Sequence, residues 1–409
     1  GFILPSKFFN SDYGEGLRKI IAGGKLLNKL IDFKSYQIFD GATTYTCLLF
    51  LKKITNLTFK YATLKNEELF KNLNLLEDSI LNVFTSKLPS ENQRWAFMSN
   101  DKEIILEKIS KNKLTLADIT RKIFTGIQTS ADKIYVLRLI NKKKGTLILF
   151  SESLNAEVEL ERDLVKPFLL GSDVHRYDLP INDKFVIFPY LIVNEKPVLM
   201  TQEFIKKTFP NGWKYLSKNK KNLENRENGK MKNDKFYSYI YPKNLSEFER
   251  NKIIMPHVAL KPQFTYDKNR LYHTTNVYSL VFKKIIKESE MFFLGVLNSE
   301  LFTFYMKNKA PILRGGYLNF KPIYISPFPI IEMNLYNQKI KENHDIVVAL
   351  VEKMLSLHKR LNELGDKHTV ERERIEEEIK KTDAEIDELV YKLYGITEEE
   401  KRIIEDSLR

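Results

Sequence analysis

The first 51 residues alternate between the hydrophobic patterns of strands and of a helix. Residues 1–5, GFILP, have the apolar character of a strand, and residues 14–30 carry Leu and Ile at helical spacing. Residues 30–51, LIDFKSYQIFDGATTYTCLLFL, form two apolar runs around a polar turn at Asp40-Gly41, a dipeptide typical of hairpins. The order strand, helix, strand, strand predicts an α/β sheet that ends in an antiparallel hairpin.

The pattern changes twice after this hairpin. The residues up to 112 are polar, have helical spacing and are expected to be connective. Short β-rich runs then alternate with long segments of Lys, Asn and Tyr, which predicts an irregular α+β domain with large loops. From Ile346 the apolar positions step by three and four, pause at Gly365-Asp366 and resume, which predicts an antiparallel helical hairpin. We therefore expect a mixed α/β and α+β fold with three consecutive domains, residues 1–112, 113–340 and 341–409.

The charge balance favours a polyanionic partner. Lys and Arg together number 66 against 53 Asp and Glu, which gives a net charge of +13 and a pI near 9.3. A nucleic acid is the simplest polyanion for such a chain, although a generally Lys-rich proteome would give the same surplus. An RNA-binding protein of similar charge is an alternative to a DNA-binding one.

The densest group of cations lies in residues 213–243, WKYLSKNKKNLENRENGKMKNDKFYSYIYPK, where Lys and Arg are interleaved with aromatic residues. Cations among rings and amides are typical of a nucleic-acid surface, and a solvated Lys-rich loop is the alternative. Arg226 is expected to contact guanine, because Arg alone among these cations has a planar fork for a bidentate bond; a phosphate contact is the alternative. The predicted DNA-binding residues are Lys214, Lys218, Lys220, Lys221, Arg226, Lys230, Lys232, Lys235 and Arg314.

The sequence argues against several kinds of site. The single Cys47 cannot form an internal disulfide, and the six His residues have no metal-ligand spacing. No apolar run reaches the roughly 18 residues of a membrane span, and no charged-then-apolar leader opens the chain. A cytoplasmic protein without a metal is expected. Because Gly1 begins inside a strand-like run, we also expect the chain to be a portion of a longer protein.

Three short motifs carry little functional meaning. AGGK at residues 22–25 lacks the upstream Gly and the following Ser or Thr of a phosphate-binding loop. SPFP at residues 326–329 differs at its third position from the active-site tetrapeptide of amino methyltransferases. The triplet Asp32-Phe33-Lys34 has the spacing of part of a nuclease site, but no upstream acid lies in a matching strand. We therefore assign no catalytic residue to the chain.

The order of several segments resembles one family, the adenine-specific DNA methyltransferases of restriction-modification systems (type IIG-like) with a TaqI-like target-recognition domain. Residues 1–21 and 30–51 are similar to the strand, helix and hairpin that follow the catalytic tetrapeptide in that family. Residues 386–405, IDELVYKLYGITEEEKRIIE, resemble the tail common in large single-chain enzymes of this kind. The segments that resemble successive landmarks of the recognition domain are FTGIQTSADKIYVL (124–137), VKPFLLGSDVHRY (165–177), KIIMPHVALKPQFTYD (252–267), FLGVLNSELFTFYM (293–306) and ISPFPI (325–330).

The resemblance implies a function for the whole protein. It would transfer a methyl group from S-adenosylmethionine to the amino nitrogen of an adenine that has left the duplex, and Phe39 would be the ring that stacks on this base. Neither F-x-G-x-G nor N-P-P-Y occurs in the sequence. The chain alone is therefore expected to bind double-stranded DNA, to hold no cofactor and to transfer no methyl group.

Two further readings stay open at this point. A phage-defence methyltransferase without a nuclease domain shares the same segments, and only upstream sequence would distinguish it. A specificity subunit would use the predicted helical hairpin to bind partner subunits or a second copy. Such a subunit would typically carry two recognition domains and two helical spacers, whereas the sequence shows one of each.

Overall fold

The chain divides into two units that are not consecutive in sequence. In the computed structural model, the first unit comprises residues 1–113, 303–319 and 391–409, and the second comprises residues 114–302 and 320–390. This division differs from the three consecutive ranges expected from the sequence, because the chain returns twice to the first unit. The structure describes residues 1–34, 36, 38–39, 41, 44–64, 81–91, 95, 97, 99–178, 183–365 and 368–408.

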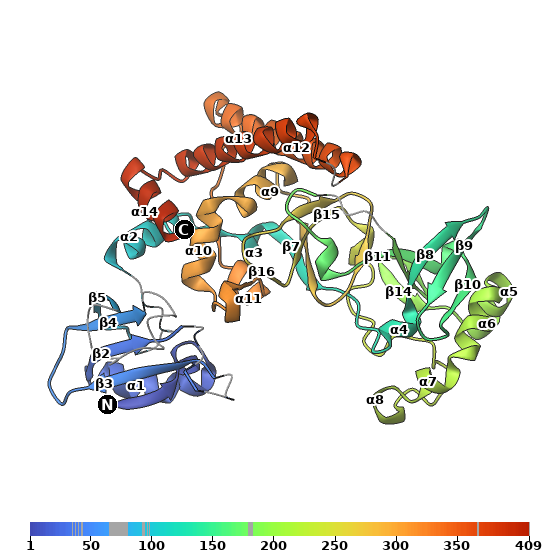
Figure 1. Ribbon diagram of the computed structural model, residues 1–409, viewed down its shortest axis with the longest axis horizontal. Coiled ribbons are helices and arrows are strands. Elements are labelled where there is room, and N and C mark those ends of the chain that lie inside the picture. Colours follow the sequence, from blue (N-terminus) through green and yellow to red (C-terminus); the bar gives the residue numbers. More distant parts are fainter. Residues whose placement is uncertain are drawn as a thin grey trace. The chain divides into compact units, whose positions relative to one another are not determined.

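A five-stranded sheet forms the centre of the first unit (Figure 1), with the strand order β1-β3-β2-β4-β5. Strands β2 and β4 pair in parallel, and the other neighbours pair antiparallel. The predicted order strand, helix, strand, strand is confirmed, but the helix ends at Gly23, and residues 27–30, expected in the helix, belong to the next strand. The elements are β1 (Phe2–Pro5), α1 (Glu15–Gly23), β2 (Leu27–Asp32), β3 (Thr46–Leu51), β4 (Thr58–Leu64) and β5 (Leu81–Lys87).

The polar stretch after the hairpin differs from the expected helical connection. It contributes β4 and β5 to the sheet, and only then forms a helix, α2 (Asn100–Ile109). Strand β4 buries Phe59 and Tyr61 but exposes the intervening Lys60. Strand β5 lies at the edge of the sheet and exposes most of its side chains. Strand β5 fully buries Leu81 alone, so its sequence is too polar for the hydrophobic pattern to reveal it. Strand β4 buries four of its seven residues, but Thr58 and Lys60 interrupt its apolar pattern.

Strands β2 and β3 form the predicted antiparallel pair, with Asp32 opposite Cys47 at the last paired position. Their connection runs from residue 33 to residue 45, so it is longer than the two-residue turn expected at Asp40-Gly41. Gly41 has φ +76, a left-handed conformation that favours glycine. Asp40 itself lies outside the described residues.

Two sheets form the frame of the second unit, with the strand orders β10-β9-β8-β12-β11-β18 and β17-β15-β19-β7. One hydrophobic core contains residues from both sheets, among them Phe124, Leu149 and Tyr272. The expected irregular α+β architecture is confirmed. The strands are β7 (Thr120–Thr125), β8 (Val136–Lys142), β9 (Thr146–Ser151), β10 (Ala156–Glu161), β11 (Val165–Leu169), β12 (Lys184–Ile187), β15 (Lys252–Pro256), β17 (Thr265–Asp267), β18 (Tyr272–His273) and β19 (Val277–Phe282).

Shorter elements connect these sheets. A two-stranded hairpin is made of β13 (Tyr190–Val193) and β14 (Lys196–Leu199). The remaining short strands are β6 (Leu114–Thr115), β16 (Val258–Ala259), β20 (Leu318–Asn319) and β21 (Pro329–Ile330). The short helices are α3 (Leu116–Ile119), α4 (Asp132–Tyr135), α5 (Gln202–Thr208), α6 (Pro210–Lys218), α7 (Lys220–Glu224), α8 (Arg226–Gly229), α9 (Glu290–Asn298), α10 (Glu300–Lys309) and α11 (Pro322–Ile325).

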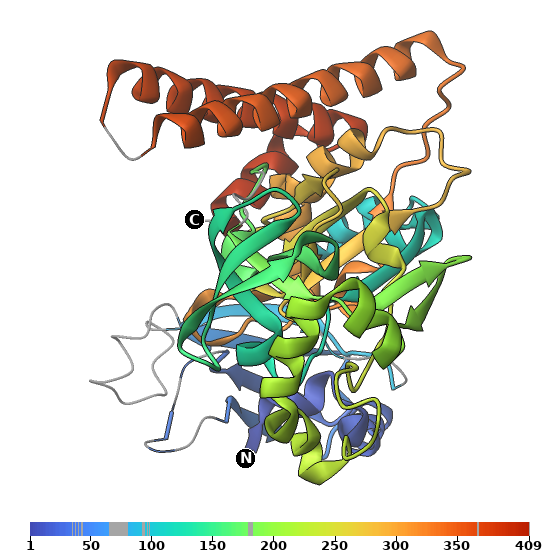
Figure 2. The same ribbon diagram turned by 90° about the vertical axis from the view of Figure 1, so that its right-hand side faces the viewer.

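The C-terminal helical hairpin is confirmed, as α12 (Gln338–Leu364) and α13 (Val370–Leu393), followed by α14 (Glu398–Leu408). Figure 2 shows α12 and α13 side by side, and the ion pair between Arg360 and Glu371, at 2.7 Å, joins them near the turn. The buried face of α12 differs from the predicted one: it contains Val347, Val351 and Met354, whereas Ile346 is 48% exposed.

The hairpin packs against α9 of the same unit and is not a separate domain. At Gly295 of α9, an added Cβ would lie 3.0 Å from Val351 and 3.1 Å from Val347. A glycine therefore allows α12 to approach α9 closely at this position. Most of α13, up to Val390, also belongs to the second unit.

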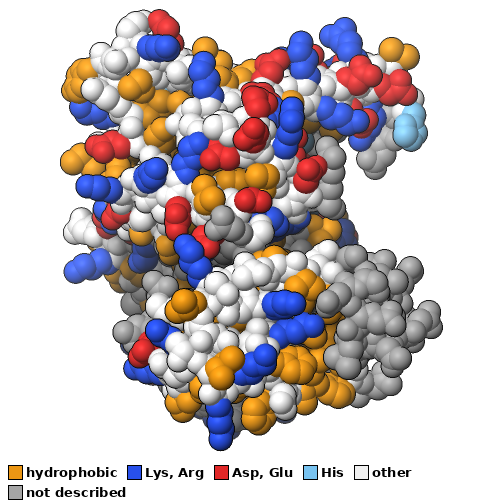
Figure 3. Space-filling view, turned by 90° about the vertical axis from the view of Figure 1, so that its left-hand side faces the viewer, with side chains coloured by type: hydrophobic (Ala, Val, Ile, Leu, Met, Phe, Trp, Pro, Cys, Tyr) orange, Lys and Arg blue, Asp and Glu red, His pale blue; other side chains and the backbone are white. Residues whose placement is uncertain are grey.

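The first unit leaves several large apolar side chains exposed. Phe2 and Ile3 of β1 are 57% and 48% exposed, and Ile20 of α1 is 65% exposed. Among the described strands, β1 pairs with β3 alone and so has one uncovered edge. Figure 3 shows hydrophobic side chains beside Lys and Arg on one face of this unit. Within the described part of the chain, no helix has the length and apolar character needed to cross a membrane.

Candidate nucleic-acid interface

The Lys-rich segment of the second unit is helical, which corrects the expectation of a long loop. Residues 213–243 contain most of α6, then α7, α8 and a series of turns. Tyr215, Phe236, Tyr237 and Tyr239 are all buried, with exposed fractions of 2–3%. The interleaving of cations and rings therefore comes from amphipathic packing, because the rings face the core while the cations face solvent. These aromatic residues are not available to stack on bases.

The lysines of this segment form an exposed basic surface, which we call the lysine surface. Two of its members make ion pairs with acids of the same segment: Lys220 with Glu224 at 3.6 Å and Lys230 with Glu227 at 3.4 Å. The others form no ion pair with any residue that the structure describes. The lysine surface consists of Lys214, Lys218, Lys220, Lys221, Lys230, Lys232 and Lys235, all exposed.

Opposing charge on this segment is sparse. Between residues 214 and 235 the seven lysines are accompanied by three acids, Glu224, Glu227 and Asp234. Exposed ammonium groups at this density attract a polyanion and can replace its counterions. The predicted lysines thus lie on α6, α7 and the turns that follow α8, and their contact with DNA stays a prediction.

Arg226 has a structural role that the sequence did not indicate. Its side chain is buried, with 6% exposed, and its guanidinium lies 5.5 Å from the ring centre of Tyr135. It donates hydrogen bonds to four backbone carbonyls: Nε to Leu223 at 2.9 Å, Nη1 to Thr129 at 2.9 Å, and Nη2 to Phe236 at 2.5 Å and Ser238 at 2.9 Å.

These four bonds occupy the donors with which an arginine would contact guanine. A guanidinium enclosed among backbone carbonyls does not reach a base edge. The expectation that Arg226 discriminates bases is therefore wrong for this structure. Arg226 instead joins the lysine surface to residues 129 and 236–238 of the same unit.

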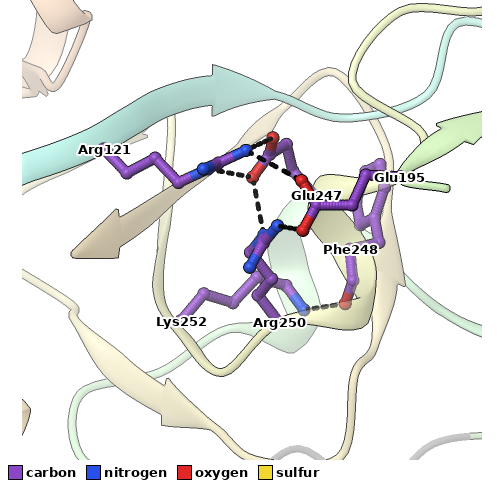
Figure 4. Close-up of polar contacts among 6 residues, drawn as sticks. All are labelled: Arg121, Glu195, Glu247, Phe248, Arg250 and Lys252. Atoms are coloured by element: carbon purple, nitrogen blue, oxygen red, sulfur yellow. Dashed lines mark hydrogen bonds and ion pairs between the residues drawn. The ribbon is translucent and has the colours of Figure 1, made fainter. Parts of the chain in front are cut away.

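Two other arginines of the second unit are neutralised by nearby acids (Figure 4). Arg121 on β7 lies 3.4 Å from Glu247 and 3.5 Å from Glu195 at the turn between β13 and β14. Arg250 bonds the same two carboxylates, Glu195 at 2.5 Å and Glu247 at 3.2 Å. The bond to Arg250 lowers the pKa of Glu195, and the bond to Glu247 raises the pKa of Arg121. Two cations and two anions cancel, so this network adds no net charge to the candidate interface.

A buried ion pair lies beside this network. The Nζ of Lys252 is 2.6 Å from the carboxylate of Asp267, and both side chains are fully buried. Lys252 also donates to the carbonyl of Phe248 at 3.0 Å, as Figure 4 shows. Burial lowers the pKa of Lys252, and the Asp267 carboxylate opposes this shift. Such a pair fixes the backbone around β15 and cannot contact a ligand in solvent.

Arg314, the one predicted cation outside the lysine surface, lies in the first unit and not in the second. It begins a turn at residues 314–316, and its side chain is exposed. Its backbone N–H donates to the hydroxyl of Tyr45 at 2.8 Å. The structure places it outside the lysine surface, and its contact with DNA stays a prediction.

Phe39 lies beyond the end of β2 and is 45% exposed. Its neighbours Tyr36 and Ile38 are half-buried and pack on a small core that contains Phe33. A ring exposed to this degree is accessible to a base. Its role as a stacking ring for a base stays a prediction.

Among the described residues, no group of three or more His, Cys, Asp or Glu side chains has the geometry to hold a metal ion.

Comparison with known proteins identifies a family model that matches part of the chain, several relatives in sequence and a solved structure with a similar fold. Residues 166–330 match the family described as the TaqI-like C-terminal specificity domain. The chain is 26% identical over 414 residues to the type II restriction enzyme and methyltransferase RM.Eco57I of Escherichia coli, covering 97% of this chain and 40% of that protein. It is 25% identical over 376 residues to the type II methyltransferase M.HincII of Haemophilus influenzae, covering 87% of this chain and 67% of that protein.

A solved structure shares the fold. It is the type IIL restriction-modification enzyme MmeI in complex with DNA, with a TM-score of 0.58 at 10% identity. The alignment covers 100% of this chain and 49% of that one. The chain thus spans less than half the length of both RM.Eco57I and MmeI.

Proposed function

We propose that this chain, whose residues 166–330 are a TaqI-like C-terminal specificity domain and whose relatives are type II restriction-modification methyltransferases, is the sequence-specific DNA-recognition portion of such an enzyme. The observation that carries the proposal is the lysine surface on α6, α7 and the turns after α8, which lies within the matched residues. Exposed lysines with few opposing acids supply the sequence-independent part of DNA affinity. The specificity domain would add contacts to base edges.

The salt dependence of DNA binding tests this proposal. Each lysine that neutralises a phosphate contributes roughly 0.9 to the slope of log affinity against log salt concentration. Replacing Lys218, Lys220 and Lys221 with Ala should therefore reduce the slope for a random duplex by about 2 to 3. Fluorescence anisotropy at a series of NaCl concentrations measures it.

A matched control removes the same charge elsewhere in the second unit. Lys142, Lys143 and Lys144 are exposed where β8 turns into β9, and their triple Ala variant should leave the slope nearly unchanged. If both triple variants flatten the slope equally, the lysine surface is not the DNA-binding site.

We also propose that the whole protein methylates the adenine amino group with S-adenosylmethionine, and that Phe39 stacks on the extruded adenine. The partial exposure of Phe39 beyond the end of β2 supports this role, since a base can reach such a ring. The edge of β1, which no described strand covers and which carries the exposed Phe2 and Ile3, supports a further catalytic part, because proteins normally cover an edge strand of this kind.

The residues of this chain do not fit the S-adenosylmethionine donor itself. Gly14 has another use: an added Cβ there would lie 2.3 Å from the carbonyl of Phe8, so this glycine allows close backbone packing, whereas an added Cβ at Gly16 would have no atom within 4 Å. With neither F-x-G-x-G nor N-P-P-Y in the sequence, we assign no step of methyl transfer to the chain. Incubation with labelled S-adenosylmethionine and DNA should give no incorporation above the control without protein. Incorporation above that control would contradict the assignment.

A further inference from the structure

Residues 126–131 of the second unit form a loop, GIQTSA, whose start is fixed by close backbone packing. The N–H of Ile127 donates to the carbonyl of His273 at 2.8 Å. An added Cβ at Gly126 would lie 2.1 Å from that carbonyl and 2.2 Å from the carbonyl of Thr274. No side chain fits at this position, so a glycine lets the loop lie directly against β18.

The far side of the loop is fixed by Arg226. Its Nη1 donates to the carbonyl of Thr129 at 2.9 Å. The hydroxyl of Thr129 bonds the carboxylate of Asp132 and accepts from the N–H of Ala131 at 3.0 Å. In addition, the backbone of Gln128 bridges that of Tyr241. Residues 126–129 of the loop are thus held by contacts from distant parts of the unit.

Within this fixed loop the side chains alternate between the core and solvent. Ile127 is 3% exposed and Thr129 is 1% exposed, whereas Gln128 and Ser130 are exposed. Ser130 has φ +53, in the left-handed region that non-glycine residues seldom adopt. The amide of Gln128 makes no hydrogen bond to any residue that the structure describes. A rigid backbone therefore presents an amide whose donors and acceptor are available to a ligand.

The loop is joined to the lysine surface by two separate contacts. Arg226, which holds Thr129, also begins α8 of the lysine surface. Tyr241, which bridges Gln128, lies under the ammonium of Lys230 at 5.2 Å and donates to Glu227 at 3.0 Å. A duplex that binds the lysine surface would lie next to this loop.

We propose that Gln128 recognises the edge of an adenine in the major groove, and that Arg226 is a positioning residue for the loop that carries it. The inference rests on the proposed function. A glutamine amide matches the donor and acceptor pattern of adenine N6 and N7 in a bidentate manner. Discrimination by such a pair requires that the backbone beneath it be fixed, as it is here. A phosphate contact needs no such rigidity.

Selection from a pool of random duplexes tests the proposal. The wild-type chain and Gln128→Ala are each used to enrich bound duplexes, which are then sequenced. We expect wild type to enrich a motif and Gln128→Ala to lose the preference for adenine at one position of it. Affinity for the wild-type motif should fall about 5- to 150-fold, while the salt slope for random duplexes is unchanged.

The control is Gln338→Ala, which removes an amide from α12 and should leave the motif unchanged. Arg226→Lys, which keeps the charge but loses the fork, should weaken the same adenine position as Gln128→Ala. An unaltered motif for Gln128→Ala overturns the inference, and so does an equal loss of affinity for all duplexes, which would indicate a phosphate contact. In either case the salt slope of wild type still supports DNA binding. A wild-type chain that binds no duplex would refute the proposed function as well.

Discussion

The variant Arg226→Ala should destabilise the second unit strongly. The substitution removes four hydrogen bonds from a buried guanidinium to backbone carbonyls. A bond from a charged donor is worth about 1.5–3 kcal/mol, so a simple sum would give roughly 6–12 kcal/mol. Removing the charge also relieves its desolvation, which offsets much of this sum, while each buried carbonyl left without a donor costs about 1–3 kcal/mol. We therefore expect a loss of about 3–5 kcal/mol in the free energy of unfolding.

Urea denaturation followed by tryptophan fluorescence can isolate this effect. The chain has two tryptophans. Trp213 packs on Phe236 and Tyr237 of the second unit, at centroid distances of 5.9 Å, while Trp95 lies in the core of the first unit. With Trp95→Phe as the background, the signal of Trp213 reports unfolding of the second unit.

The matched control is Lys221→Ala, an exposed neighbour whose loss should change the free energy by less than about 0.5 kcal/mol. Arg226→Lys should fall between the two, because a lysine keeps the charge but makes fewer bonds. If Arg226→Ala unfolds at the same urea concentration as the control yet loses sequence discrimination, the buried role is refuted and a direct base contact is restored.

Two further predictions concern single side chains. Burial raises the pKa of Asp387 to about 7, above its usual value of 3.8, so the folded state holds the proton more tightly than the unfolded state. The stability that this proton contributes is complete below about pH 4 and is lost as the pH rises through 7. The melting temperature of Asp387→Asn should therefore change less between pH 5 and pH 8 than that of wild type. The same pH dependence in both proteins would contradict the raised pKa. Phe39→Ala should lower the unfolding free energy by less than about 1 kcal/mol, because the ring is largely outside the core, whereas Phe33→Ala, at 1% exposure, should cost about 3–5 kcal/mol. Equal losses in the two variants would show that Phe39 is a packing residue and not a base-stacking one.

The parts of the fold that the sequence predicted are those with a strong hydrophobic period. Strand β3 is apolar in its last five residues, CLLFL, and the hairpin of α12 and α13 repeats its apolar residues over more than six turns. Strand β5 escaped prediction because full burial of Leu81 alone leaves a polar sequence, and β4 escaped it because Thr58 and Lys60 interrupt its apolar residues. The buried face of α12 was shifted by one residue, because helical spacing alone does not reveal which neighbour, here α9, covers the helix.

The candidate site was predictable in its charge and not in its geometry. The density of lysines correctly predicted that their side chains are exposed, since charged side chains seldom lie buried without a partner. The burial of Arg226 depends on the carbonyl of Thr129, which is 97 residues away in the chain. Gln128 was overlooked although it lies in the segment FTGIQTSADKIYVL. The glycine two positions before it was the available signal, because a glycine beside a strand often marks close approach of two backbones.

The return of the chain to the first unit has a consequence for the order of synthesis. Helix α14 packs on α2, and Lys108 bonds Glu400 at 2.6 Å across 292 residues of sequence. A ribosome would therefore deliver all of the second unit, up to Val390, before the first unit receives its last helix. Until then the surface of α2 that α14 covers would stay open on the nascent chain. A stop codon placed after residue 390 would leave the second unit complete in sequence and would deprive the first unit of a helix.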